Sequence, residues 1–131
     1  MVKKLRKNYP TIIQISCKVA FGMRYMNSLR MLHRDIKLSN ILVSNDFQTV
    51  KLCDFGLSVV PDDDVEEVAS RSPLQRKMTC VGTGNYMAPE MKTGEGNYAS
   101  DVYSFGVMLS LLLGYPAKMQ KKRNLIKNYF Q

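Results

Sequence analysis

The residues best suited to chemistry gather in one short segment, residues 33–40. It reads His-Arg-Asp-Ile-Lys-Leu-Ser-Asn, and so places an imidazole, a carboxylate, an ammonium and an amide within eight positions. The chain contains a single histidine, and it is His33, the first of these residues. A lone aspartate or histidine more often makes structural hydrogen bonds than it takes part in catalysis. The segment must therefore be interpreted together with the later part of the chain.

Two further strings come after this segment. Asp54-Phe55-Gly56 is preceded by a run of β-forming residues, and residues 82–90 read Gly-Thr-Gly-Asn-Tyr-Met-Ala-Pro-Glu. Three triplets, His33-Arg34-Asp35, Asp54-Phe55-Gly56 and Ala88-Pro89-Glu90, make ten specified residues together with Asn40. Ten such residues in this order would arise by chance on the order of once in 10¹³ placements. Together the strings resemble the catalytic loop, the metal-binding turn and the end of the activation segment of the eukaryotic protein kinases.

The resemblance implies roles in phosphoryl transfer for five residues. Asp35 matches the carboxylate that orients the substrate hydroxyl and accepts its proton, and Lys37 matches a positive charge near the γ-phosphate of ATP. Asn40 and Asp54 match the ligands of Mg²⁺, a hard cation that prefers oxygen. Leu42 resembles the residue beneath the adenine ring. The implied cofactors are ATP and Mg²⁺.

A second group resembles positions that support or regulate the kinase site, and it comprises His33, Arg34, Phe55, Gly56, Thr83, Glu90 and Asp101. Arg34 matches an arginine that binds a phosphate on the activation segment. His33 and Phe55 match parts of the hydrophobic column of the active state. Thr83 matches a threonine that contacts the catalytic aspartate and lysine. Asp101 matches the aspartate that holds the catalytic-loop backbone, with a helix N-cap as a compatible alternative.

The implied function is that of a protein serine/threonine kinase. Lys37 and Thr83 fit this type, whereas tyrosine kinases usually have a residue other than lysine at the first of these positions. Residues 85–87 and 100–107 are more similar to the tyrosine-kinase-like group, whose members mostly phosphorylate serine or threonine. The expected partners are ATP and a protein substrate.

The hydrophobic pattern indicates the elements that position these residues. Apolar residues at steps of three and four predict a helix over residues 12–32, capped at Thr11. Two β-compatible runs, residues 41–43 and 49–52, predict a small hairpin, and Ser44-Asn45-Asp46 supplies its turn.

Residues 57–80 have no regular pattern, and an acidic block in them is followed by a basic block rich in serine. So long a stretch inside a compact domain is usually functional or disordered. Ser70, Ser72 and Thr79 are candidate phosphorylation sites for an upstream kinase, and a merely solvated loop is the alternative. A short turn or helix is expected from residue 88.

The last predicted element is an apolar helix. It is expected to begin at Ser100 or Asp101, and Gly114 and Pro116 should end it. The apolar stretch over residues 102–115 is shorter than the roughly 20 residues that a membrane span requires. No membrane span is therefore predicted.

Charge and cysteine content limit the expected classes of partner and the expected cellular compartment. The net charge of +8 comes from 19 Lys and Arg against 11 Asp and Glu, with the excess near the two ends of the chain. Nucleic-acid motifs are absent, so no nucleic-acid partner is expected. Three cysteines form no CxxC pair, and their odd number argues against a disulfide framework. An intracellular, cytoplasmic location is favoured.

The predicted fold class is mainly α, a partial protein-kinase-like large lobe with helices, a small β-hairpin and a long activation segment. We expect a partial kinase domain over residues 9–116, between a basic leader at 1–8 and a basic tail at 117–131. No glycine-rich loop and no strand lysine precede His33, so the N-terminal lobe is expected to be absent.

Two hypotheses remain open from the sequence. In the first, the chain is a truncated part of an active serine/threonine kinase, and it is inactive alone. In the second, it is a non-catalytic binding module or decoy. Because a decoy has no need of Asp35, Lys37, Asn40 and Asp54, their retention favours the first hypothesis.

Overall fold

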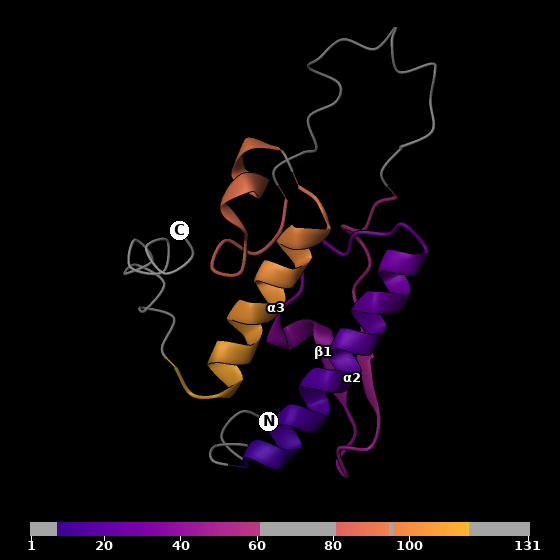
Figure 1. The fold of residues 1–131 in the computed structure, drawn as a ribbon, viewed down its shortest axis with the longest axis vertical. Helices are drawn as coiled ribbons and strands as arrows, with labels where there is room; N and C mark the ends of the chain where they lie inside the picture. The colour runs from indigo at the N-terminus through magenta and orange to yellow at the C-terminus, as the bar shows by residue number, and fades with distance from the viewer. Residues whose placement is uncertain (1–7, 61–80, 95, 116–131) are drawn as a thin grey trace, which may run out of the picture.

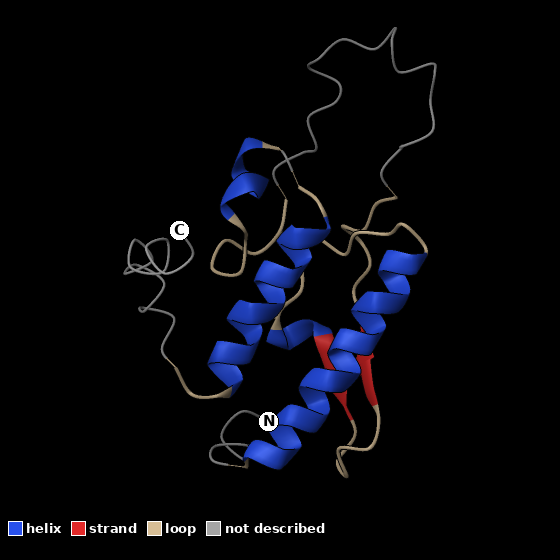
Figure 2. Ribbon diagram, in the orientation of Figure 1, coloured by secondary structure: helices blue, strands red, loops and turns tan. Residues whose placement is uncertain are grey.

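The fold is that of a computed structural model, which describes residues 8–60, 81–94 and 96–115. Two long helices, α2 (Tyr9–Ser28) and α3 (Tyr98–Leu112), lie side by side (Figure 1). A two-stranded sheet packs against α2, as Figure 2 shows. The prediction of a mainly helical chain with one small hairpin is confirmed for the described residues.

Several predictions lie outside the described residues. They concern the candidate phosphorylation sites Ser70, Ser72 and Thr79, Pro116 at the end of the apolar helix, and the basic tail over residues 117–131. Within the part of the chain that is described, no helix is both long and apolar enough to cross a membrane.

Helix α2 begins earlier than the sequence predicted. Asn8, not Thr11, is its N-cap, and the Asn8 side chain accepts the main-chain N–H of Thr11 at 3.3 Å. Pro10 fits the first turn because its missing N–H would have no partner there. The periodic apolar pattern starts only at Ile12 and therefore did not reveal this first turn.

The same helix ends at Ser28, four residues before the predicted limit at residue 32. Arg30 takes a left-handed φ of 53°, and the N–H of Met31 bonds back to the carbonyl of Met26 at 2.9 Å. This hydrogen-bond pattern is a Schellman C-cap, which usually has glycine at the left-handed position. Because arginine occupies that position, the sequence carried no stop signal, and Leu29 leaves the apolar stripe and is exposed.

The core lies between α2, α3 and the segment that joins α2 to the sheet. Its buried side chains are Ile12, Ile15, Val19, Ile36, Ile41, Met108 and Leu112. The predicted apolar stripe of α2 supplies three of them. Burial of each such side chain contributes about 1.5–3 kcal/mol relative to exposure. Packing, more than helix propensity, therefore holds the two helices together.

The hairpin has β1 (Ile41–Val43) and β2 (Val50–Leu52) in an antiparallel pair. Ile41 lies opposite Leu52 in this register. The turn is docked on α2, because Lys18 Nζ donates to the carbonyl of Gln48. The predicted hairpin is confirmed.

Helix α3 begins before the predicted start at residue 100 or 101. Asn97 caps it, and the side chains of Asn97 and Ser100 bond reciprocally to the main chain in a capping box. Its end agrees with the sequence, since Gly114 takes a left-handed φ of 87° and Tyr115 N–H bonds back to Ser110 O at 2.9 Å. The short helix expected from residue 88 is the 3₁₀ helix η3 (Pro89–Thr93).

Two neighbouring isoleucines on α2 test where the core lies. Ile12 is 1% exposed and Ile13 is 61% exposed. We expect Ile12→Ala to lower the free energy of unfolding by about 2–5 kcal/mol, because it removes buried contacts and leaves a cavity. The matched Ile13→Ala change should stay within about 0.5 kcal/mol of the parent. Urea unfolding followed by circular dichroism measures both changes. Equal losses of unfolding free energy in the two variants would show that Ile12 is not buried in the core.

Candidate active site

A buried carboxylate on α3 holds the start of the 33–40 loop. Asp101 Oδ2 accepts the main-chain N–H of His33 at 2.7 Å, and Oδ1 accepts that of Arg34 at 2.9 Å. Hydrogen bonds to an ionised acceptor are shorter and stronger than those between neutral groups. The helix and the loop are therefore joined at two consecutive residues.

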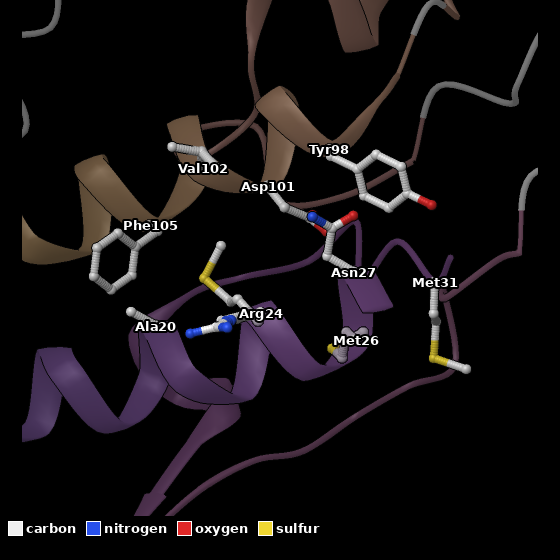
Figure 3. A pocket seen from close by; sticks show the side chains of 10 residues that line it. Ala20, Arg24, Met26, Asn27, Met31, Tyr98, Asp101, Val102 and Phe105 are labelled. Carbon is white, nitrogen blue, oxygen red and sulfur yellow. The ribbon is translucent and has the colours of Figure 1, made fainter. Parts of the chain in front are cut away.

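Asp101 also borders a cavity between α2 and α3 (Figure 3). The cavity has a volume of about 320 Å³ and a mainly apolar lining, in which Met23, Met26, Val102 and Phe105 take part. Apolar surroundings lower the local dielectric constant and strengthen hydrogen bonds to a charged group. Asp101 itself is only 9% exposed, so its hydrogen bonds to the loop are less screened than a surface contact.

Arg34 adopts a left-handed φ of 63°, which is uncommon for residues other than glycine. Its Nε donates to the carbonyl of Leu57 at 2.5 Å. Burial lowers the pKa of the Arg34 guanidinium, and the charge of Asp101 opposes that shift. Leu32 and Val59 form an antiparallel bridge close by, with N–H···O distances of 2.8 and 3.0 Å. The chain that follows Gly56 is thus fixed beside the loop.

His33 connects the loop to the end of the hairpin. Its ring is fully buried, and Nδ1 accepts the main-chain N–H of Asp35 at 3.3 Å. Nε2 must therefore carry the proton, and it donates to the carbonyl of Cys53 at 3.2 Å. The ring also stacks on Phe55 with a centroid distance of 5.1 Å. One imidazole thus orients the chain on both sides.

The hairpin register brings Asn40 and Asp54 to the same end of the sheet. Asn40 precedes β1 and Asp54 follows β2, and the main-chain N–H of Cys53 donates to the carbonyl of Asn40 at 3.0 Å. Asp54 is exposed and has a left-handed φ of 65°. Two residues with oxygen-bearing side chains, 14 positions apart in the sequence, thereby lie at one end of the hairpin.

The Asp35 carboxylate lies at the centre of a hydrogen-bond cluster and is only 6% exposed. Oδ2 accepts from Lys37 Nζ at 2.6 Å and from the Asn40 amide at 3.0 Å. Oδ1 accepts from the hydroxyl and the main-chain N–H of Thr83, at 2.7 and 3.1 Å. Lys37 Nζ also donates to Thr83 Oγ1 at 2.9 Å. Four predicted site residues are therefore in direct contact.

These donors determine the charge state of Asp35. Burial by itself raises the pKa of the Asp35 carboxyl, but hydrogen bonds from Lys37 and Thr83, the charge of Lys37 and the Asn40 amide outweigh it. The pKa of Asp35 is therefore below the ordinary value for an aspartate. The carboxylate is ionised at neutral pH and can accept a hydrogen bond from a hydroxyl.

Gly82 sets how closely the Thr83 turn approaches the 33–40 loop. Its φ is 120°, and a Cβ at this position would lie 2.6 Å from the carbonyl oxygen of Arg34. A contact this short is not tolerated, so only glycine fits. In the sequence analysis, Gly82 is part of the string over residues 82–90 and has no predicted role of its own. The signal available was a glycine directly before a residue of the predicted site.

The remaining predicted residues lie apart from this cluster. The side chains of Leu42 and Phe55 are 56% and 48% exposed. At Gly56, a Cβ would make only an ordinary contact of 3.4 Å with Asp54 Oδ1, so sterics do not require glycine. Glu90 accepts the Ser100 hydroxyl at 2.9 Å. This link between η3 and α3 is a contact that sequence reasoning did not identify.

The chain is similar in sequence to known protein kinases. The sequence model of the protein kinase domain matches residues 3–130. The probable serine/threonine-protein kinase CCRP1 of Zea mays is 39% identical over 117 residues, which cover 85% of this chain and 17% of the maize protein. Serine/threonine-protein kinase polo of Drosophila melanogaster is 36% identical over 120 residues, which cover 86% of this chain and 19% of polo.

A third relative is the tyrosine-protein kinase Srms of Mus musculus, 37% identical over 106 residues that cover 81% of this chain and 20% of Srms. The chain thus spans between 17% and 20% of the length of these curated relatives. The domain match extends over nearly the whole sequence. The chain belongs to the eukaryotic protein kinase family.

Proposed function

We propose that these residues form the catalytic part of the large lobe of a protein serine/threonine kinase, which transfers the γ-phosphate of ATP to hydroxyls of a protein substrate. One observation carries this proposal. The buried Asp35 carboxylate is held by Lys37, Asn40 and Thr83 with donor–acceptor distances between 2.6 and 3.1 Å. Phosphoryl transfer depends chiefly on such positioned charges and hydrogen bonds.

Asp35 is assigned the role of catalytic base. Its lowered pKa keeps it ionised, so it can orient a substrate hydroxyl and receive the proton as the oxygen attacks phosphorus. Lys37 keeps an ammonium at 2.6 Å from that carboxylate. An ammonium has three N–H donors, and two contact Asp35 and Thr83. We assign the third to an oxygen of the γ-phosphate.

Asn40 and Asp54 are the residues that fit Mg²⁺. The Asn40 Nδ2 group points to Asp35. Its Oδ1 oxygen accepts a 3.4 Å hydrogen bond from the Ser39 hydroxyl and has a second lone pair for a cation. Among the described residues, no group of three or more His, Cys, Asp or Glu is arranged to hold a metal. A site with one carboxylate and one amide oxygen suits Mg²⁺, which keeps phosphate oxygens and water as its other ligands. When bound, Mg²⁺ neutralises charge on the phosphates.

Three features support serine or threonine as the acceptor. Lys37 and Thr83 fit this class of kinase, and they contact each other at 2.9 Å. The maize and fly relatives are named as serine/threonine kinases. Residues 85–87 and 100–107 resemble the tyrosine-kinase-like group. The mouse relative is named a tyrosine-protein kinase, and phosphoamino-acid analysis of the product distinguishes the two acceptor classes.

The remaining roles concern regulation and nucleotide contact. Arg34 is assigned to a phosphate placed on the activation segment by an upstream kinase. Leu42, exposed on β1 at the hairpin that carries Asn40, is assigned to the adenine ring. His33 and Phe55 stack as parts of the hydrophobic column. We place this activity inside the cell, where ATP is available.

The base assignment predicts the effect of Asp35→Asn in the complete kinase domain that contains these residues. Because the amide cannot accept the proton, phosphate transfer from radiolabelled ATP to a protein substrate should fall by a factor of about 10²–10⁴. Phosphoamino-acid analysis of the product should find label on serine or threonine.

Asp46→Asn is the matched control. Asp46 is an exposed turn residue whose carboxylate bonds to Ser44 and Gln48 and to no residue of the Asp35 cluster in these contacts. Its activity should equal that of the parent. Full activity of Asp35→Asn would rule out the base assignment, and label on tyrosine alone would rule out the substrate class.

The lowered pKa of Asp35 predicts a pH dependence of stability. An aspartate titrates near 3.9 in an unfolded chain, so this ionised group stabilises the fold above about pH 4 and loses its contribution as the pH falls through the lower folded value. The difference in unfolding free energy between the parent and Asp35→Asn should therefore shrink between about pH 5 and 2 in urea titrations. A difference that stays constant or grows over that range would contradict a lowered pKa for Asp35 in the folded protein.

Residues 1–131 by themselves should not transfer phosphate. No glycine-rich loop and no strand lysine precede His33 in this sequence, and these are the parts that hold the ATP phosphates in protein kinases. The test incubates the purified chain with Mg²⁺-ATP and a basic protein substrate. Transfer that disappears on Asp35→Asn would show that the chain is sufficient for activity.

A further inference from the structure

A serine hydroxyl connects α3 to the turn that carries Thr83. Ser104 is buried, and its Oγ donates to the carbonyl of Tyr86 at 2.8 Å. The same oxygen lies 3.1 Å from the carbonyl of Ser100, one turn earlier on the helix. A hydroxyl has a single proton, so the two carbonyls share it. The shorter contact is the one that leaves the helix.

From Tyr86 the connection continues to the catalytic cluster. The main-chain N–H groups of Tyr86 and Met87 both donate to the carbonyl of Thr83, at 2.8 and 3.1 Å. These bonds close a tight turn over residues 83–87. Thr83 then contacts Asp35 and Lys37 through its hydroxyl, at 2.7 and 2.9 Å. Only one turn of chain therefore separates the Ser104 contact from the carboxylate.

Ser104 and Asp101 share one face of α3, because residues three apart in a helix are neighbours. Asp101 holds the 33–40 loop through His33 and Arg34. Ser104 holds the 83–87 turn. Both halves of the catalytic cluster are thus attached to a single helix, whose later residues Met108 and Leu112 are anchored in the core.

We propose that Ser104 is a positioning residue for phosphoryl transfer, whose hydroxyl sets the place of Thr83 against Asp35 and Lys37. The proposal rests on the proposed kinase function. Ser104 itself is not expected to touch the substrate. Its effect passes through the carbonyl of Tyr86, and loss of that bond lets the 83–87 turn move away from the carboxylate.

Ser110 provides a matched control on the same helix. Its hydroxyl donates to the carbonyl of Val107 at 2.7 Å, which is a contact within α3. Ser110→Ala therefore removes a serine hydroxyl and one helix back-bond without removing a link to the turn. Ser104→Ala removes both kinds of contact. A difference between the two variants isolates the bond to Tyr86.

The first test measures amide hydrogen exchange in the purified chain, and it needs no kinase activity. In Ser104→Ala, the amides of Thr83, Tyr86 and Met87 should exchange about 5-fold faster, the effect of losing one typical hydrogen bond. The His33 amide, held by Asp101, should keep its protection. In Ser110→Ala, the exchange of the turn should not change.

Ser104→Cys is a second variant, in which a weaker donor of similar size replaces the hydroxyl. It should accelerate exchange in the turn in the same direction. Equal exchange in the Ser104→Ala and Ser110→Ala proteins would overturn the proposal. Faster exchange that spreads over the whole of α2 in both Ser104 variants would also overturn it, because it would reveal general destabilisation.

The second test uses the complete kinase domain that contains these residues. Ser104→Ala should lower kcat for a peptide substrate about 5-fold and leave the KM for ATP unchanged, and Ser104→Thr should restore part of kcat because it keeps a hydroxyl. An unchanged kcat overturns the proposal. If the parent domain itself transfers no phosphate, the proposed function fails, and the exchange experiment still decides whether Ser104 holds the turn.

Discussion

The buried carboxylate of Asp101 is the contact on which the site geometry depends. It accepts hydrogen bonds from two consecutive main-chain N–H groups, His33 and Arg34, that lie 68 and 67 residues earlier in the chain. Arg34 takes a left-handed conformation that most residues avoid. Such backbone strain persists only where the surroundings hold it in place. Asp101 supplies that restraint, and the apolar core fixes the helix that carries it.

The rest of the site depends on this anchor. With the loop fixed, Gly82 can approach the Arg34 carbonyl, and Thr83 then reaches Asp35. The hairpin register contributes Asn40 on one side. Lys37 and Asn40 donate to the Asp35 carboxylate from its own 33–40 loop, and Thr83 donates from a turn 48 residues later. Their combined effect lowers the pKa of Asp35. The chemistry assigned to Asp35 depends both on its own loop and on the packing of the distant Thr83 turn against that loop.

The parts of the fold that could be predicted from the sequence are those encoded by residues close together in the chain. The core face of α2, the hairpin and the Gly114 helix end are encoded in periodicity and in turn-forming residues. The left-handed Arg30 could not be anticipated, because only the hydrogen bonds of the Schellman turn make arginine acceptable there. Asn97 was missed because the apolar stretch used to place this helix starts only at residue 102, five residues after the N-cap.

In the candidate site too, locally encoded residues could be predicted and tertiary contacts could not. Asp35, Lys37 and Asn40 were predicted because they belong to a short dense motif that resembles the kinase catalytic loop, and Thr83 because of the string around it. The bonds from Ser100 and Ser104 to Glu90 and Tyr86 were not found. Serines in a helix carry no signal of a tertiary partner, since their hydroxyls also bond within the helix. Contacts of this kind appear only when the segments are placed in space.

The most direct test of the anchor is the amide exchange of His33 and Arg34 in Asp101→Ala. If the carboxylate holds the loop, both amides should lose most of their protection, while the amide of Val19, inside α2, stays protected. Unchanged protection at both amides would show that the loop keeps its geometry without Asp101, and would contradict the central claim.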